Sequence, residues 1–236
     1  AAAAALVAMI GIWGMFCLVT PRASAEIAGA VRPLPSQSQL ARSVAHSLEN
    51  GLDGTTPRAT AVEAIAADMM AEQGISDTGM LVQDSHMSGI ELQAEARWED
   101  TIFEHHVREL DDAIAAQESL VTWAGLLSPH VAMRTLSAGL CGTDFAHHRH
   151  FTEYAEAWRK TLVAQLNTAF ARNAGVQGWD YRADAKLWKQ APPFQYVMPG
   201  VHFALRTHVL SALSLLCWLL IALGLALRSA TRVQVI

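Results

Sequence analysis

Residues 209–227, VLSALSLLCWLLIALGLAL, determine the class of this protein, because the stretch contains no charged residue and is followed by Arg228 and Arg232. At about 1.5 Å per helical residue it would extend about 28 Å, close to the thickness of the hydrocarbon core of a bilayer. A helix buried in a soluble protein usually carries a polar stripe, whereas this stretch has only Ser211 and Ser214. It therefore predicts a transmembrane helix at 207–228.

A second apolar run lies at the start of the sequence, where residues 1–19 contain no charge. It predicts another transmembrane helix at 1–20, before Pro21. A cleaved signal peptide is the alternative, because residues 23–25 (Ala-Ser-Ala) have the form of a cleavage site, but no basic segment precedes the run. The sequence begins with alanine rather than Met, and we expect it to be the C-terminal part of a longer protein.

The residues between the two apolar runs have helical periodicity. Apolar side chains recur at intervals of three and four residues, with few strand-like alternations. The predicted fold class is an all-α membrane protein, in which two transmembrane helices flank a helical extracytoplasmic domain at 21–206 and a short tail follows at 229–236. A loop is predicted at 75–88. Helices are predicted at 37–52, 60–73, 89–127, 129–142 and 145–173, and those at 89–127 and 145–173 are long.

The predicted core of this domain consists of large apolar side chains on the two long helices: Trp98, Ile102, Phe151, Trp158 and Leu162. Residues 175–206, which return to the last apolar run, are rich in aromatic and turn residues. Because Trp and Tyr favour the headgroup layer, this segment either lies on the membrane surface or closes the end of the helical domain. The sequence leaves both interpretations open.

The overall composition argues against several functions. The net charge is −5 and no cluster of Lys and Arg is present, which argues against nucleic acid as a partner. Of the three cysteines, Cys17 and Cys217 lie in the apolar runs, so no disulfide can hold the domain. The sequence contains neither a G-x-S-x-G nucleophile motif nor a phosphate-binding G-x-x-x-x-G-K-[ST] loop. We therefore predict no enzyme activity and no cofactor site in this chain.

Histidines offer one alternative to this prediction. His147 and His150 share a face of a predicted helix, and His105 and His106 lie on the preceding long helix. Neutral imidazoles on facing helices can bind zinc or copper. The spacing matches no known zinc motif, and the adjacent Arg149 would repel a cation. The prediction is therefore that no metal binds, with these four histidines as the alternative site.

Four short motifs follow one another along the sequence: LLSP at 126–129, AGLCGTD at 138–144, HRHF at 148–151 and PPF at 192–194. In this order and spacing the chain resembles a subgroup of ABC-transporter permeases of the type-2 export class, with a helical extracytoplasmic domain between the last two membrane helices. The resemblance covers most of the chain. The sequence departs from the pattern at Cys141, where alanine is more usual, and the region before Glu91 matches in helical character alone.

The resemblance implies a membrane-spanning permease subunit of an ATP-driven ABC exporter. Its implied partners are a separate ABC ATPase subunit that binds the ATP, a second permease copy or homologue, and the lipid bilayer. The residues that match the family's motifs, for which the resemblance implies structural roles, are Leu127, Ser128, Pro129, Gly142, Thr143, Arg149, Phe151, Pro193 and Phe194.

Basic residues beside a membrane helix are retained in the cytoplasm, so Arg228 and Arg232 predict a cytoplasmic tail. The large domain would then lie on the extracytoplasmic side of the inner (cytoplasmic) membrane. The alternative function is a two-span membrane sensor or binding protein with a helical extracytoplasmic ligand domain. We expect the short segment after the last apolar run to be too short for a signalling module, which favours the permease over that alternative.

Overall fold

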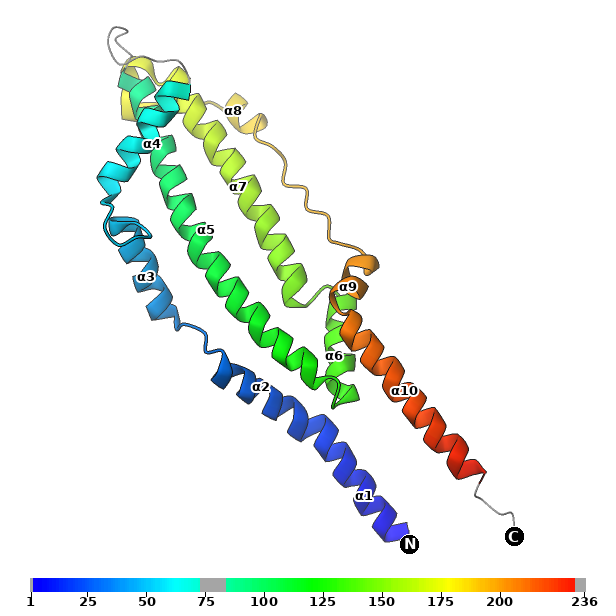
Figure 1. Ribbon diagram of the computed structural model, residues 1–236. Helices are drawn as coiled ribbons and strands as arrows, with labels where there is room; N and C mark the ends of the chain where they lie inside the picture. Colours follow the sequence, from blue (N-terminus) through cyan, green and yellow to red (C-terminus); the bar gives the residue numbers. More distant parts are fainter. Residues whose placement is uncertain (1, 73–83, 232–236) are drawn as a thin grey trace. The chain divides into compact units, whose positions relative to one another are not determined.

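The computed structural model describes residues 2–72 and 84–231, and within these ranges it contains helices and no strand, which confirms the all-helical prediction (Figure 1). Ala1–Leu34, Asp111–Phe151 and Val197–Ile236 form one compact unit, here the first unit; Pro35–Leu110 and Thr152–Tyr196 form the second unit. The helices follow one another in the order α1 (Ala2–Gly14), the π-helix η1 (Met15–Val19), α2 (Thr20–Val31), α3 (Gln37–Asn50), α4 (Arg58–Glu72), α5 (Asp84–Ala124), α6 (Pro129–Leu140), α7 (Phe145–Asn173), the 3-10 helix η2 (Gly175–Asp180), α8 (Ala185–Lys189), α9 (Val201–Thr207) and α10 (Val209–Ala230).

The helix bounds differ from the prediction mainly around α5. α7 has the predicted bounds, and α6 begins at Pro129 as expected. Residues 84–88, predicted as part of a loop, are the first residues of α5, whereas the rest of that predicted loop, 75–83, lies outside the described residues. α5 ends at Ala124 rather than at Leu127, because the residues that follow Ala124 form the turn into α6.

The core of the second unit lies between α4 and α5. Trp98 of α5 also donates its indole N–H to the Leu48 carbonyl oxygen of α3 at 3.1 Å, which ties α3 to the same core. Gly89 of α5 lies so close to α7 that a Cβ there would fall 2.2 Å from the Cβ of Ala171. The buried side chains form two clusters along α4 and α5: Ala66, Met69, Ile90 and Ala94, then Ala61, Trp98 and Ile102.

The core prediction was right for α5 and wrong in part for α7. Trp98 and Ile102 are buried, at 9% and 0% exposure. Phe151 is 42% exposed, and Trp158 and Leu162 are half-buried. The reason lies in the neighbour that covers Trp158: its indole N–H donates to the carbonyl oxygen of Pro192 at 2.8 Å, so an irregular segment rather than another helix packs there.

This irregular segment, which follows α8, closes the side of α7 with aromatic contacts. Phe194 packs edge-to-face against Tyr154 and Trp158, with ring centroids 5.4 Å apart in both pairs. The Tyr154 hydroxyl donates to the Gln195 carbonyl oxygen at 2.6 Å. Of the two interpretations of the aromatic return segment, these contacts favour closure of the helical domain, for the residues up to Tyr196.

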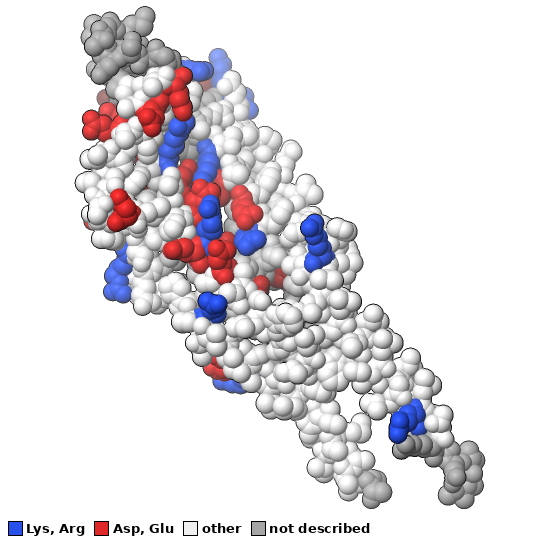
Figure 2. All heavy atoms as spheres, in the orientation of Figure 1, with Lys and Arg blue, Asp and Glu red and all other residues white. Residues whose placement is uncertain are grey.

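Ion pairs cover the polar faces of the second unit. Figure 2 shows acidic and basic side chains side by side on the face that is drawn. Exposed pairs of this kind contribute little to stability, typically about 0–1 kcal/mol each. The apolar clusters therefore contribute most of the stability of this unit. The pairs join Arg58 to Glu95 and Glu99, Arg159 to Asp100 and Glu156, and Lys160 to Glu104.

The first unit contains both apolar helices. Ala3–Val31, which runs through α1, η1 and α2, and Val209–Ala230 are long and apolar enough to cross a membrane. Figure 2 shows α1 and most of α10 without charged side chains until the arginine near the end of α10. The first of these helices continues past the predicted end at residue 20, because η1 widens the turn before Pro21, which lacks a backbone N–H.

α6 contacts η1 and α2 of the first apolar helix, and it contacts α9 and α10 near the C-terminus. The two serines that interrupt the apolar surface of α10, Ser211 and Ser214, are buried on the side of α10 that packs in this unit. Small side chains let helices approach closely, as is common between helices in membranes. α6 therefore contacts both apolar helices within the first unit.

Candidate functional site

Ser128, the serine of the LLSP motif, joins α6 to the first apolar helix. Its side chain is fully buried. The Oγ accepts a hydrogen bond from the Val131 backbone N–H at 3.4 Å, which caps the N-terminus of α6. The same hydroxyl donates to the Phe16 carbonyl oxygen at 2.8 Å. Phe16 lies in η1, so one side chain caps α6 and bonds the π-helical turn.

The turn from α5 into α6 is bonded to α10 in the same way. Ser214 Oγ donates to the Gly125 carbonyl oxygen at 2.7 Å, and Trp218 Nε1 donates to the Leu126 carbonyl oxygen at 3.2 Å. Carbonyl groups at the C-terminal end of a helix lack partners within that helix. N–H groups of the turn satisfy the last carbonyl groups of α5, and side chains of α10 satisfy the next two, those of Gly125 and Leu126. The Trp218 ring also contacts Phe16, with centroids 5.2 Å apart.

A buried carboxylate, Asp144, joins two histidines at the other end of α6. It precedes α7 and accepts a hydrogen bond from the His147 backbone N–H at 3.1 Å. One carboxylate oxygen faces His147 Nδ1 and the other faces His208 Nε2, both within hydrogen-bonding distance. All three side chains are less than one-tenth exposed. Since His208 directly precedes α10, Asp144 fixes the start of α7 to the start of this apolar helix.

Two glycines of the AGLCGTD motif make room for this cluster. A Cβ on Gly139 would lie 2.2 Å from Cδ2 of His208, so only glycine lets the imidazole lie against α6. Gly142 has φ +69°, a left-handed conformation that favours glycine. This conformation turns the chain from α6 towards Asp144 and α7.

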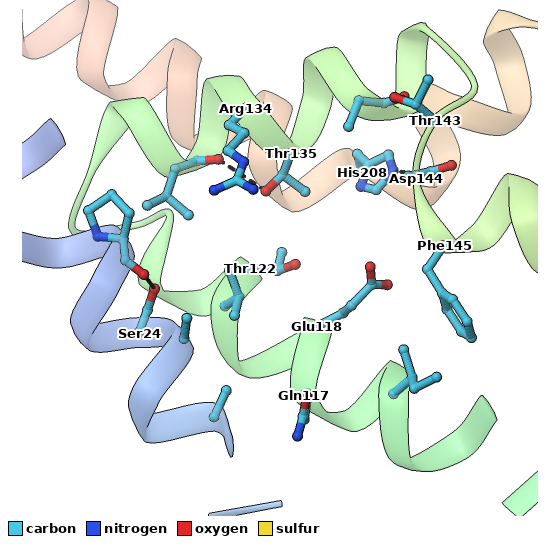
Figure 3. Close-up of a pocket in the computed structure, with 17 residues that line it drawn as sticks. Ser24, Gln117, Glu118, Thr122, Arg134, Thr135, Thr143, Asp144, Phe145 and His208 are labelled. Atoms are coloured by element: carbon cyan, nitrogen blue, oxygen red, sulfur yellow. Dashed lines mark hydrogen bonds and ion pairs between the residues drawn. The ribbon is translucent and has the colours of Figure 1, made fainter. Parts of the chain in front are cut away.

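A cavity of about 420 Å³ opens beside the cluster, within the first unit. α2, α5, α6, the start of α7 and His208 form its walls. Figure 3 shows Glu118 reaching into this space from α5 and Arg134 from α6, with Asp144 and His208 at one side. Its apolar lining includes Ala25, Ile114, Val121, Val131 and Phe145.

The two carboxylates at the cavity are perturbed in opposite directions. Burial raises the pKa of Glu118, and the negative charge of Asp144 raises it further, against the opposing effect of His208. Burial also acts to raise the pKa of Asp144, but hydrogen bonds from His208 and His147 outweigh it, so the pKa of Asp144 lies below its ordinary value. Asp144 is therefore the ionised, bonded carboxylate, while Glu118 forms no hydrogen bond or ion pair with another described residue.

Comparison with known protein families identifies the family of this chain. Residues 43–197, more than half of the chain, match the family described as "Domain of unknown function (DUF3526)". The chain belongs to this family. No curated protein and no solved structure matches the chain. Of the features above, the DUF3526 match includes the LLSP turn, Glu118, Arg134 and Asp144, whereas both apolar helices and His208 lie outside it.

The motif residues named from the sequence are not gathered at one place. Within the first unit, Leu127 is 70% exposed at the turn, Ser128 and Pro129 begin α6, and the Thr143 hydroxyl donates to the Ala138 carbonyl oxygen at 3.3 Å. Arg149 and Phe151 are exposed on α7. Pro193 and Phe194 belong to the second unit, where Phe194 covers α7.

The four candidate metal ligands belong to different units. His147 binds Asp144, and both His147 and His150 pack against the Phe203 ring, with centroids 5.0 and 5.9 Å away. His105 and His106 lie on α5 in the second unit beside Glu109. Among the described residues no group of three or more His, Cys, Asp or Glu could hold a metal ion.

Sequence reasoning missed Glu118, Arg134 and His208, and it included Asp144 only as the last residue of the AGLCGTD motif. A histidine directly before an uncharged apolar run was the one available signal for His208. Its partner precedes it by 64 positions, and no periodicity connects residues that far apart.

Proposed function

We propose that this chain is a membrane-spanning permease subunit of an ATP-driven ABC exporter, energised by a separate ATPase subunit and paired with a second permease copy or homologue. In this proposal both apolar helices cross the inner (cytoplasmic) membrane, and the second unit lies on the extracytoplasmic side. The observation that carries the proposal is the bonding of the α5–α6 turn to both apolar helices, through Ser128, Ser214 and Trp218.

The depth of this turn supports a membrane setting. At about 1.5 Å per residue, Trp218 lies about 18 Å from the end of α10 at Ala230, well within a hydrocarbon core of about 30 Å. Backbone groups at such a depth need partners inside the protein, and the Gly125 and Leu126 carbonyl groups have them. Leu127, 70% exposed, would then face lipid rather than water.

The bonded turn also gives a route for mechanical coupling. α5 continues without a break from the turn into the second unit. A shift between the two apolar helices would break or move the bonds at the turn, and with them the C-terminal end of α5. Coupling of this kind requires an energy source that favours one of two states, and an ATPase subunit supplies it in the proposal.

Copurification tests the proposal directly. The full-length protein, extracted in mild detergent, is expected to retain a P-loop ATPase. Inactivation of the nucleotide site of that ATPase should abolish export while the complex stays assembled. Recovery of an active protein that contains no ATPase would contradict the proposal and would favour the two-span sensor, for which the cavity beside Glu118 would be the ligand site.

A cross-link tests the coupling route. The pair Phe16→Cys and Trp218→Cys, in a background without Cys17, Cys141 and Cys217, joins the two apolar helices where their rings now touch. The oxidised or bridged pair should depress the coupled ATPase rate, and reduction should restore it. The control is each single cysteine variant under the same oxidant. An unchanged rate in the bridged pair would rule out relative movement at this point.

A further inference from the structure

The cavity of the first unit carries two opposite charges without partners. Glu118 and Arg134 both line it, and neither forms a hydrogen bond or ion pair with the other or with another described residue. Asp144, the other acidic group at the cavity, has both carboxylate oxygens engaged by His147 and His208. The cavity therefore offers one free anion and one free cation, on facing helices (Figure 3).

The cavity also lies at a defined level of the apolar helices. Its wall on α2 includes Pro21, Ser24 and Ala28, directly after the uncharged residues 1–20, and Arg22 is the first charged residue of the sequence. On the other side, His208 directly precedes the uncharged start of α10. If both helices cross a bilayer, as the proposed function requires, the cavity lies where they leave the hydrocarbon, at the level of the headgroups.

We infer that this cavity binds a zwitterion that carries an ammonium and a phosphate group, and specifically the headgroup of a phospholipid with a primary amine. Arg134 would bind the phosphate and Glu118 the ammonium, whose N–H groups can donate hydrogen bonds to a carboxylate. A volume of about 420 Å³ is within the range of small-molecule sites. Exposed apolar side chains close in sequence to the lining, Val19 and Trp123, would contact the acyl chains.

A lipid source is favoured over a free zwitterion because of the level of the cavity. A soluble ligand would have to leave bulk water for the headgroup layer, whereas a phospholipid is already present there at high local concentration. A phospholipid also accounts for the exposed apolar side chains beside the charged cavity, because these side chains would contact its acyl chains.

The test uses the full-length protein in detergent and measures bound lipid by native mass spectrometry, with phosphatidylethanolamine, phosphatidylglycerol and soluble phosphoethanolamine as separate probes. Phosphatidylethanolamine should bind in preference to phosphatidylglycerol. Glu118→Gln should abolish this preference, and Arg134→Gln should weaken both lipids about tenfold or more, as expected for loss of a hydrogen bond to a charged group. Exposed charges outside the cavity supply the matched controls, Glu63→Gln and Arg97→Gln, which should bind like the unmodified protein.

Three results would overturn the inference: equal binding of the two lipids, binding that survives both cavity substitutions, or binding of phosphoethanolamine as tight as that of the intact lipid. Circular dichroism of each variant distinguishes loss of the site from loss of folding, and the conservative pair Glu118→Asp and Arg134→Lys should retain part of the affinity. Lipid binding requires no ATPase, so a negative result here leaves the copurification test intact. Lipid binding without a copurified ATPase would contradict the exporter proposal but not the lipid site.

Discussion

At the scale of single residues, the first unit depends on side chains that bond to two elements at once. Ser128 caps α6 and bonds η1, and Asp144 binds the first turn of α7 and the histidine that precedes α10. Each of these groups is buried, so the loss of one partner leaves a polar group without water to replace it. Substitutions at such positions should cost more than at exposed caps or exposed ion pairs.

The Asp144 cluster predicts acid sensitivity with a defined direction. Because the pKa of Asp144 is lower in the folded protein than its ordinary value of 3.8, its bonds contribute stability above that value, and the contribution is lost as the pH falls through the lower, folded pKa. Glu118 has the opposite effect: its raised pKa lowers stability as the pH rises from 4.5 through the folded value. Of the two carboxylates at the cavity, Asp144 is therefore the one that contributes to acid loss below pH 4; Asp53 and Glu156, whose pKa values are also lowered, add to that loss elsewhere in the protein.

Asp144→Asn should lower the free energy of unfolding at pH 7 by about 1.5–3 kcal/mol, the range for a hydrogen bond to a charged group, and should flatten the pH dependence below pH 4. Thermal denaturation in detergent between pH 7 and pH 3 measures both effects. The matched control is Asp68→Asn, at an exposed position of α4. A variant that loses stability in acid as steeply as the unmodified protein would show that another group is responsible.

At the scale of elements, α6 is a short helix whose role comes from its neighbours. It contacts η1, α2, α9 and α10, and it lies between the LLSP turn and the Asp144 cluster. In isolation a helix of this length is only marginally stable in water. Its stability in the protein therefore depends on its cap and on packing, especially where Gly139 lets His208 lie against it.

Two serine caps in different units give a matched comparison. Ser36 caps α3 at an exposed site, where its Oγ accepts from the Gln39 backbone N–H, so Ser36→Ala should cost about 1 kcal/mol. Ser128→Ala removes a similar cap and also leaves the Phe16 carbonyl group without its donor, so it should cost about 2–4 kcal/mol. Denaturation of both variants in the same detergent gives the difference. Equal costs would mean that the bond to η1 contributes nothing.

At the scale of the whole molecule, the polarity of the chain changes sharply between its regions. The apolar helices Ala3–Val31 and Val209–Ala230 carry charges only near one end, whereas the surfaces of α4, α5 and α7 carry ion pairs. A bilayer accepts the apolar helices and excludes surfaces that carry ion pairs. This distribution, with the basic residues at the end of α10, leads to the proposed sidedness.

Cysteine labelling in intact cells tests that sidedness. In a background without the three native cysteines, Glu63→Cys on α4 should react with a membrane-impermeant thiol reagent, because the proposal places the second unit outside. Ser229→Cys, beside Arg228 at the end of α10, should react only after lysis. Both residues are exposed, so access to the reagent depends on the membrane alone. The reverse pattern would invert the orientation.

Much of the secondary structure followed from local rules in the sequence. Charge-free runs predicted both apolar helices, and three- and four-residue periodicity predicted a helix from Pro129, where α6 begins, and α7 to its last residue. These features are decided by neighbours a few positions away, so the sequence alone contains the information. The same periodicity marked Phe151 as core and was wrong, because a periodic face shows which side is apolar but not what covers it.

The cavity and its charged groups were decided by tertiary structure alone. Asp144 meets His208, and Ser128 meets Phe16, across separations of 64 and 112 positions, for which no sequence pattern exists. Glu118 and Arg134 are both exposed residues, and they become the charges of a cavity only because α2, α5 and α6 border the same space. The hydrogen bonds that set the pKa of Asp144 below its ordinary value, and the burial and neighbouring charge that set the pKa of Glu118 above it, arise only when distant helices pack together.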